Sequence, residues 1–309
     1  MSLKIIYAGT PEFAVPPLAR LIEQGHTVCA VYSQPDRPAG RGRKPLASPV
    51  KQYALSQAIP VFQPVTLKQQ TELAQLRELD ADLMLVVAYG LLLPQSVIDI
   101  PRLGCINIHA SLLPRWRGAA PIQRAIEAGD AMTGVSLMHI VEALDAGPVL
   151  HTVETPLGHN ETAGELHDRL SLLGAQALID LLPKLENKAI TAQIQATEGV
   201  TYAAKISKAE ARIDWSNSAE QIHRKICAFN PWPVAYAEFQ GKTLRVWRSQ
   251  RLQQTANAET GCVEIAAGHL DVACAEGVLR LLEIQLPGAK RISGRDFINA
   301  HRNQLLVFN

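Results

Sequence analysis

Asn107 and His109 lie two residues apart in the segment 105–109, where apolar and polar side chains alternate. Such alternation is typical of a β-strand, in which successive side chains point to opposite faces. We therefore expect the amide of Asn107 and the imidazole of His109 on one face, with Ile106 and Ile108 on the other. An amide that donates a hydrogen bond, beside an imidazole that donates or accepts a proton, is suited to activating a carbonyl group.

The segment Leu144-Asp145-Ala146-Gly147 supplies a candidate third member of this group. The carboxylate of Asp145 can orient and charge-stabilise the imidazole if the fold brings the two together. Asn, His and Asp suffice to move an acyl group directly onto an amine, so no nucleophilic Ser or Cys is implied. The alternative is a satisfied polar pair at the end of a strand. The turn 111–114 and the segment 144–147 favour the catalytic interpretation.

These motifs resemble those of the 10-formyltetrahydrofolate-dependent formyltransferases. The resemblance rests on Asn107-x-His109-x-Ser111-Leu-Leu-Pro114, followed by Leu144-Asp145-x-Gly147. It extends from Lys4 almost to the C-terminus, and only the tail after Gly288 is less distinctive. Further similar segments are Ala8–Pro11, Gln34–Gly42, Arg115–Pro121 and Phe229–Pro233. The resemblance implies that Asn107, His109 and Asp145 are catalytic and that 10-formyltetrahydrofolate is the formyl donor.

A folate site is expected beside these residues, because ligands of open α/β sheets bind beyond the carboxyl ends of the strands. Tyr89 and Gly90 follow the apolar run 81–88, and the leucines after them are suited to an apolar wall, although they also fit an ordinary core. The resemblance implies that three segments hold the flat pterin. Their residues are Tyr89, Gly90, Leu91, Leu92, Ser111, Leu112, Leu113, Pro114, Ile140, Val141 and Glu142.

The distribution of charge bears on the acceptor of the acyl group. The chain carries a net charge of only +1, but Pro35–Lys51 holds five basic residues against one acidic residue. Positive segments of this kind suit the phosphates of RNA, although most charge runs are simply solvated. The resemblance implies methionyl initiator tRNA as the acceptor. The expected tRNA contacts are Arg37, Arg41, Arg43, Lys44, Lys290, Arg291 and Arg295.

Strand and helix patterns alternate from Lys4 to Leu185, which predicts an α/β fold with a Rossmann-like, doubly wound parallel sheet. Thr10 is placed to cap the first helix of this fold. Gly9 stands alone rather than in a Gly-x-Gly-x-x-Gly motif, so a dinucleotide site is not expected.

A second fold type is predicted for the C-terminal part. Five short strand patterns follow Pro233, and their number is compatible with several β folds. The resemblance favours a small β-barrel of the OB type, a common oligonucleotide-binding fold. We therefore expect a catalytic domain at 1–189, a linker at 190–206 and a tRNA-binding domain at 207–309.

Composition narrows the class of protein. The segment 1–9 is too short and too strand-like for a signal peptide, and no apolar run is long enough to cross a membrane. Five scattered cysteines without Cys-x-x-Cys favour reduced thiols in a cytoplasmic protein. The nine histidines show no zinc-ligand spacing, so we expect no metal. Nothing in the sequence demands more than a monomer.

Two other functions stay open at this stage. The first is a folate-dependent formyltransferase that acts on an amino sugar nucleotide or a purine precursor; neither the segment 36–44 nor Phe229–Pro233 is expected in such an enzyme. The second is a non-enzymatic RNA-binding or folate-binding protein that has kept the fold. The intact set of Asn107, His109 and Asp145 argues against this second function.

Overall fold

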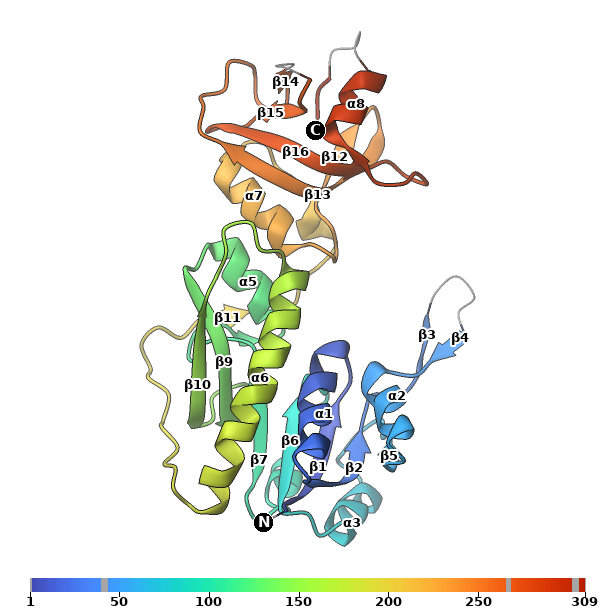
Figure 1. The fold of residues 1–309 in the computed structure, drawn as a ribbon, viewed down its shortest axis with the longest axis vertical. Helices are drawn as coiled ribbons and strands as arrows, with labels where there is room; N and C mark the ends of the chain where they lie inside the picture. The colour runs from blue at the N-terminus through green and yellow to red at the C-terminus, as the bar shows by residue number, and fades with distance from the viewer. Residues whose placement is uncertain (1, 40–43, 265–267, 302–305, 309) are drawn as a thin grey trace. The chain divides into compact units, whose positions relative to one another are not determined.

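The computed structural model describes residues 2–39, 44–264, 268–301 and 306–308 (Figure 1). The chain forms two compact units, each assembled from several segments. The first unit comprises 1–118, 133–155 and 167–202, and the second comprises 119–132, 156–166 and 203–309. The division into domains at 189 and 207 stays a prediction.

The first unit is built on a seven-stranded sheet of order β10-β9-β7-β6-β1-β2-β5. Its strands are β1 (Lys4–Gly9), β2 (Thr27–Tyr32), β5 (Val61–Phe62), β6 (Leu83–Val87), β7 (Cys105–His109), β9 (Met132–His139) and β10 (Val149–Pro156). The strands from β7 to β5 pair in parallel, as the alternating pattern predicts. β9 instead runs antiparallel to β7, so the parallel sheet ends at β7. The Rossmann-like class is confirmed, with this departure at one side.

Helices and short strands complete the first unit. They are η1 (Glu12–Ala14), α1 (Val15–Glu23), α2 (Pro49–Ser56), α3 (Gln70–Glu78), α4 (Gln95–Ile98), α6 (Ala163–Glu186), β3 (Arg37–Ala39), β4 (Lys44–Leu46), β8 (Arg117–Gly118) and β11 (Tyr202–Ala203). The first turn of α6 and the last residue of β11 are counted with the second unit. In Figure 1, α1 and α6 lie in front of the strands β1, β6 and β7. The Ser171 hydroxyl of α6 donates to the Phe13 carbonyl at 2.7 Å, which ties α6 to η1.

Thr10 does not cap the first helix, because a 3-10 turn at Glu12–Ala14 precedes α1 and leaves Thr10 outside the first helical turn. Its hydroxyl donates to the Tyr89 carbonyl at 2.9 Å and accepts from the Gln34 N–H at 3.2 Å. Thr10 therefore links the segments that leave β1, β2 and β6, at the carboxyl end of the sheet.

The second unit contains a mostly antiparallel sheet of order β12-β13-β16-β15-β14, with β17 paired to β16. Its elements are α5 (Pro121–Ala128), η2 (Ala209–Ala211), α7 (Ala219–Ala228), β12 (Tyr236–Phe239), β13 (Lys242–Leu252), β14 (Val263–Glu264), β15 (Asp271–Ala273), β16 (Val278–Gln285), β17 (Ile292–Ser293) and α8 (Gly294–Ala300). α7 begins at a capping box, in which Ser218 and Gln221 satisfy each other's backbone N–H groups. All five predicted strands are present; closure of the sheet into an OB-type barrel stays a prediction.

Candidate active site at the carboxyl end of the central sheet

Asn107 and His109 lie on β7, which pairs with β6 on one side and β9 on the other. Ile106 and Ile108 are buried, and Ile108 packs closely against Gly174 of α6. Asn107 is half-buried, and its amide makes no hydrogen bond with the described part of the chain. The alternation predicted for β7 is confirmed, and it leaves the amide of Asn107 available to a bound molecule.

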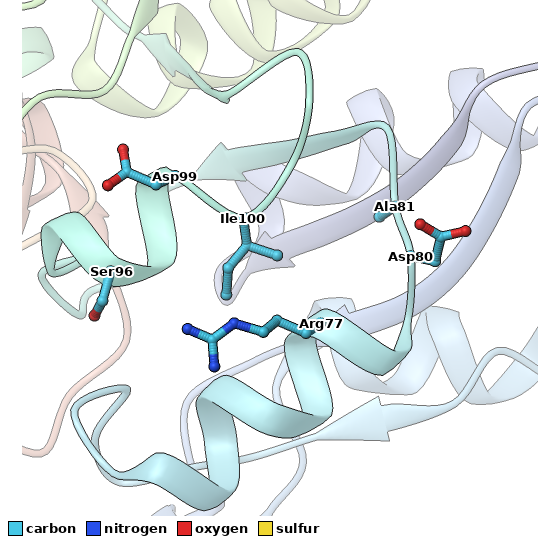
Figure 2. Close-up of a pocket in the computed structure, with 6 residues that line it drawn as sticks. All are labelled: Arg77, Asp80, Ala81, Ser96, Asp99 and Ile100. Atoms are coloured by element: carbon cyan, nitrogen blue, oxygen red, sulfur yellow. The ribbon is translucent and has the colours of Figure 1, made fainter.

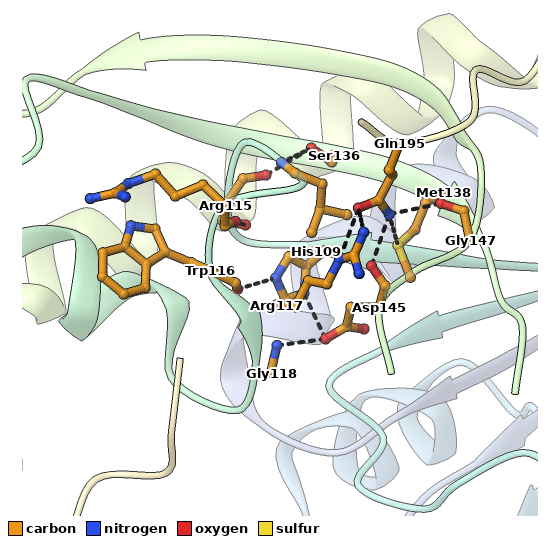
Figure 3. Close-up of polar contacts among 12 residues, drawn as sticks. His109, Arg115, Trp116, Arg117, Gly118, Ser136, Met138, Asp145, Gly147 and Gln195 are labelled. Carbon is orange, nitrogen blue, oxygen red and sulfur yellow. Dashed lines mark hydrogen bonds and ion pairs between the residues drawn. The ribbon is translucent and has the colours of Figure 1, made fainter. Parts of the chain in front are cut away.

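The imidazole of His109 faces Asp145, as the sequence predicted. His109 Nδ1 lies 3.7 Å from Asp145 Oδ2, beyond hydrogen-bond length, and both side chains are largely buried. The other ring nitrogen, Nε2, lies 2.8 Å from the Trp116 carbonyl oxygen (Figure 3). Because a carbonyl oxygen only accepts, Nε2 carries the hydrogen in this arrangement.

Asp145 is positioned by its backbone as well as by its carboxylate. Its φ of 47° lies in the left-handed region, where Asp is among the better-tolerated residues. Oδ2 accepts a hydrogen bond from the Gly118 N–H at 2.8 Å. Two residues later, a Cβ on Gly147 would lie only 1.7 Å from the His139 carbonyl oxygen, so this close approach requires glycine.

Gln195 and Arg117 also belong to this site, although no role was predicted for them. Gln195 Nε2 lies 2.8 Å from the carbonyl oxygens of both Asp145 and Gly147. Its Oε1 accepts from Arg117 Nε at 3.0 Å and from Nη2 at 2.7 Å (Figure 3). Gln195 lies in the predicted linker, where no motif distinguishes it. Arg117 falls in a segment that carries the family resemblance, which was the only signal available.

The turn after β7 is fixed by serine hydroxyls. Ser111 is fully buried and donates to the Arg115 carbonyl at 2.6 Å. The Ser136 hydroxyl of β9 donates to the Ser111 carbonyl at 2.8 Å and accepts from the Leu113 N–H at 3.1 Å. Ser111 therefore shapes the turn 111–114, while Leu112, Leu113 and Pro114 are half-buried.

Two further segments expected at the folate site, 89–92 and 140–142, pack against the same part of the core. Leu91 and Ile140 pack against a cluster that contains Tyr89. Leu92 and Val141, on the same two segments, are 80% and 37% exposed. Gly90 and Glu142 are also exposed. The two segments thus offer apolar surface of the kind that covers a flat aromatic ring.

The chemistry of the cysteines and of possible metal ligands is limited. All five cysteines are free, and burial raises the pKa of the Cys105 thiol to about 12, which keeps it protonated. Among the described residues, no group of three or more His, Cys, Asp or Glu side chains is arranged to hold a metal. Within the same ranges, no helix is long and apolar enough to cross a membrane.

The residues expected to bind tRNA lie in different environments. Arg37, on β3, is exposed and donates to Gln34. Arg41 and Arg43 lie outside the described residues, as does the side chain of Lys44.

In the second unit, Lys290 and Arg295 are exposed. The Arg291 guanidinium lies 3.3 Å from the centroid of the Trp247 ring and 3.6 Å from Glu283. Arg291 is thus partly engaged by its own chain.

A hollow of about 380 Å³ lies elsewhere in the first unit (Figure 2). It is lined by Arg77, Asp80, Ala81, Ser96, Asp99 and Ile100. Asp80 and Ala81 lie shortly before the start of β6 at Leu83, whereas Tyr89 follows the end of the strand. The hollow is therefore at the opposite end of β6 from the candidate site.

Structural comparison supports the fold assignment. An N-formyltransferase from Helicobacter canadensis, solved with folinic acid and dTDP-3-aminofucose, matches 90% of this chain and 98% of its own with a TM-score of 0.69 and 17% identity. HypX from Aquifex aeolicus, solved with tetrahydrofolic acid, matches 99% of this chain with a TM-score of 0.67 and 15% identity. This chain spans 48% of the HypX chain. At these identities the likeness concerns the fold.

Sequence comparison is more specific. The methionyl-tRNA formyltransferase of Methylococcus capsulatus is 56% identical over 97% of both chains. That of Coxiella burnetii is 50% identical over 99% of this chain and 98% of its own. The family model for formyl transferases matches residues 1–182, and the model for the formyl transferase C-terminal domain matches 205–302. With an amide, an imidazole and a carboxylate gathered at the end of β7, this chain belongs to the formyl transferase family.

Proposed function

We propose that the protein transfers the formyl group of 10-formyltetrahydrofolate to the free amino group of methionyl initiator tRNA, giving N-formylmethionyl-tRNA for translation initiation. The observation that carries the chemistry is the convergence of Asn107, His109 and Asp145 at the carboxyl end of β7. The choice of acceptor is supported by relatives named methionyl-tRNA formyltransferase, which are 50–56% identical over nearly the whole chain. We place the reaction in the cytoplasm and expect a monomer to carry it out.

The residues beside the site fit a folate donor. Leu92 and Val141 leave apolar surface exposed for a flat ring. The backbone around Gly90 and Glu142 is accessible for hydrogen bonds to the polar edge of such a ring. Ser111 contributes indirectly, because its hydroxyl is already committed to the Arg115 carbonyl. The other proposed folate contacts are Tyr89, Leu91, Leu112, Leu113, Pro114 and Ile140.

In the proposed reaction, the amino group forms a bond to the formyl carbon, and the bond from that carbon to N10 of the folate breaks. Negative charge grows on the formyl oxygen in the transition state. Asn107 is suited to stabilise it, because its amide makes no hydrogen bond with the described part of the chain. The attacking amine must lose a proton, and N10 must gain one.

His109 and Asp145 are proposed to handle these charges. His109 Nε2 is held by the Trp116 carbonyl, so the ring must exchange this carbonyl for a substrate atom before it can donate to the formyl oxygen. Asp145 lies on the other side of the ring and stabilises an imidazolium. The pair can therefore take up the amine proton, directly or through water.

Recognition of the tRNA is assigned to two basic regions. Arg37, Arg41, Arg43 and Lys44 are proposed to contact phosphates near the reactive end of the tRNA. In the second unit, the proposed tRNA contacts are Lys290, Arg291 and Arg295. We accordingly propose that 207–309 is the tRNA-binding domain. Arg291 serves this role only if its guanidinium keeps one face free while it stacks on Trp247.

Parallel formylation assays test the proposal. The protein is supplied with 10-formyltetrahydrofolate and one of three amines: methionyl initiator tRNA, an amino sugar nucleotide or glycinamide ribonucleotide. We expect transfer to the tRNA alone. Faster transfer to either small amine would overturn the proposed acceptor, and binding of tRNA and folate without any transfer would overturn the proposed activity.

A further inference from the structure

The side-chain amide of Gln195 uses its full hydrogen-bonding capacity within the first unit. Nε2 donates to the carbonyl oxygens of Asp145 and Gly147, both at 2.8 Å. Oε1 accepts two hydrogen bonds from the Arg117 guanidinium, at 3.0 Å and 2.7 Å. A single side chain thus joins the loop that carries Asp145 to the segment that follows the turn 111–114.

The chemistry of the partners determines the orientation of this amide. A rotation by 180° would place the NH2 group of Gln195 against the Arg117 guanidinium, which has only donors. It would also place Oε1 against the carbonyl oxygens of Asp145 and Gly147, which only accept. Only one of the two orientations satisfies all four contacts, so Gln195 is held in a single arrangement.

These contacts close a ring of interactions around Asp145. One side of the ring runs from the Asp145 carbonyl through Gln195 to Arg117. The other side is the hydrogen bond from the Gly118 N–H, next in sequence to Arg117, to Asp145 Oδ2. The same short segment, Arg117–Gly118, therefore holds both the backbone of Asp145, through Gln195, and its carboxylate, directly.

The backbone of Asp145 needs such support. Its φ of 47° is a sparsely populated conformation, which persists where surrounding contacts enforce it. Gly147 packs directly on the His139 carbonyl, so the loop is also constrained on that side. Removal of the Gln195 donors would leave two carbonyl oxygens without these partners and would free the loop to relax.

We propose that Gln195, held by Arg117, is a positioning residue that sets the place of the Asp145 carboxylate opposite His109. The proposal rests on the proposed function, because it concerns the effectiveness of Asp145 in formyl transfer. It also gives a specific role to a segment, 190–206, that the sequence presents as a linker. A small displacement of a catalytic group is costly in rate while substrate binding elsewhere is spared.

The experiment compares Gln195→Met, which keeps the length of the side chain but removes its hydrogen bonds, with the matched control Gln193→Met. Gln193 lies two residues earlier, is exposed, and contacts Val149 through its backbone. We expect Gln195→Met to lower kcat for formylation by about 10- to 100-fold, with KM for folate and for tRNA within about 3-fold of wild type. Gln193→Met should retain wild-type constants.

A double-mutant cycle separates positioning from general damage. If Gln195 acts through Asp145, the variant carrying both Gln195→Met and Asp145→Asn should be no slower than Asp145→Asn alone. Additive losses, or a wild-type kcat for Gln195→Met, would overturn the proposal. Should Gln195→Met fail to fold, Arg117→Met takes its place in the same cycle and is judged by the same outcomes.

The same cycle distinguishes this inference from the proposed function. A wild-type rate for Asp145→Asn itself would refute the proposed catalytic role of Asp145. A slow Asp145→Asn variant beside a fast Gln195→Met variant would refute only the positioning role. Gln195→Glu gives a further check, because it keeps an acceptor for Arg117 but sets a carboxylate against two carbonyl oxygens; we expect it to be at least as slow as Gln195→Met.

Discussion

Asp145 Oδ2 stands between two partners: it accepts the Gly118 N–H at 2.8 Å and lies 3.7 Å from His109 Nδ1. The backbone thus fixes the carboxylate, while its interaction with the imidazole is electrostatic rather than a short hydrogen bond. This arrangement leaves the imidazole able to shift toward a substrate without breaking a strong bond to Asp145. The charge of Asp145, more than its hydrogen-bonding geometry, is therefore expected to matter for turnover.

Asp145→Asn tests the role of this charge. Asparagine tolerates the left-handed backbone and retains an oxygen for the Gly118 N–H, so the fold should be preserved. We expect kcat to fall by about 100-fold or more, since the imidazolium loses its counter-charge. Steady-state formylation kinetics measure the effect, with Asp168→Asn at an exposed site as control. Turnover near wild type in Asp145→Asn would contradict the prediction.

Asn107→Ala tests the stabilisation of the formyl oxygen. The amide makes no hydrogen bond with the described part of the chain, so its removal leaves no protein group without a partner. Loss of one such donor typically costs roughly 3–4 kcal/mol of barrier, or about 100- to 1,000-fold in kcat. Folate affinity, measured by equilibrium binding, should change little. A variant that weakens folate binding and keeps kcat would instead assign Asn107 to the folate site.

Gly147→Ala tests the close approach beside Asp145. The added Cβ would meet the His139 carbonyl oxygen at 1.7 Å and its carbonyl carbon at 2.8 Å, and these are backbone atoms rather than the end of a flexible side chain. We expect the free energy of unfolding to fall by about 1–3 kcal/mol, accompanied by a loss of kcat as the Asp145 loop shifts. Gly158→Ala is the control, because its Cβ would make an ordinary contact at 3.4 Å. Equal stabilities of the two variants would refute the steric argument.

Neutralisation of Arg41, Arg43 and Lys44 to glutamine tests the proposed basic tRNA contact. Each lost phosphate contact should make the dependence of log K on log salt shallower by about 0.7–0.9 units. We also expect kcat/KM for tRNA to fall while folate binding is retained. Binding and formylation are measured at several salt concentrations. The control neutralises three exposed cations elsewhere in the first unit, Lys68, Arg77 and Lys188. An unchanged salt slope and unchanged turnover would show that Arg41, Arg43 and Lys44 do not contact the tRNA.

We expect the buried His223 to make the stability of the second unit depend on pH. Its ring is buried between Ser249 and the His159 carbonyl, and burial lowers its pKa below 6.5. The hydrogen bond to the His159 carbonyl and the charge of Glu220 raise the pKa, and the cations Arg224 and Arg251 lower it, all with smaller effect than burial.

The sign of this dependence follows from proton binding. The unfolded chain binds the proton first, so the contribution of His223 is fully present above about pH 6.5 and is lost as the pH falls toward the lower value of the folded state. Chemical denaturation between pH 7.5 and 5.5 measures the loss. His223→Gln should show a smaller loss than wild type, with the partly exposed His151→Gln as control. The same loss in His223→Gln as in wild type would contradict the assignment.

Local patterns in the sequence determined the elements that carry the candidate site. Alternation over 105–109 predicted β7 to the residue, because one of its faces is buried against α6 and the other faces the site. The continuous apolar run at 81–88 predicted β6, which is covered on both faces. The motifs around His109 and Asp145 pointed to the formyl transferase family, and the comparisons confirm that membership.

Only the tertiary structure decided how these elements are joined. β9 runs antiparallel to β7, the Thr10 hydroxyl donates to the Tyr89 carbonyl, and Gly147 packs closely on the His139 carbonyl. These features depend on residues that are far apart in sequence or on the geometry of a loop. Gln195 is the clearest case, since nothing in its neighbours distinguishes it from the exposed Gln193. A hydrogen bond depends on where its partner lies in space. Residue type and spacing along the chain do not specify the position of a partner that, like Asp145 relative to Gln195, is fifty residues away.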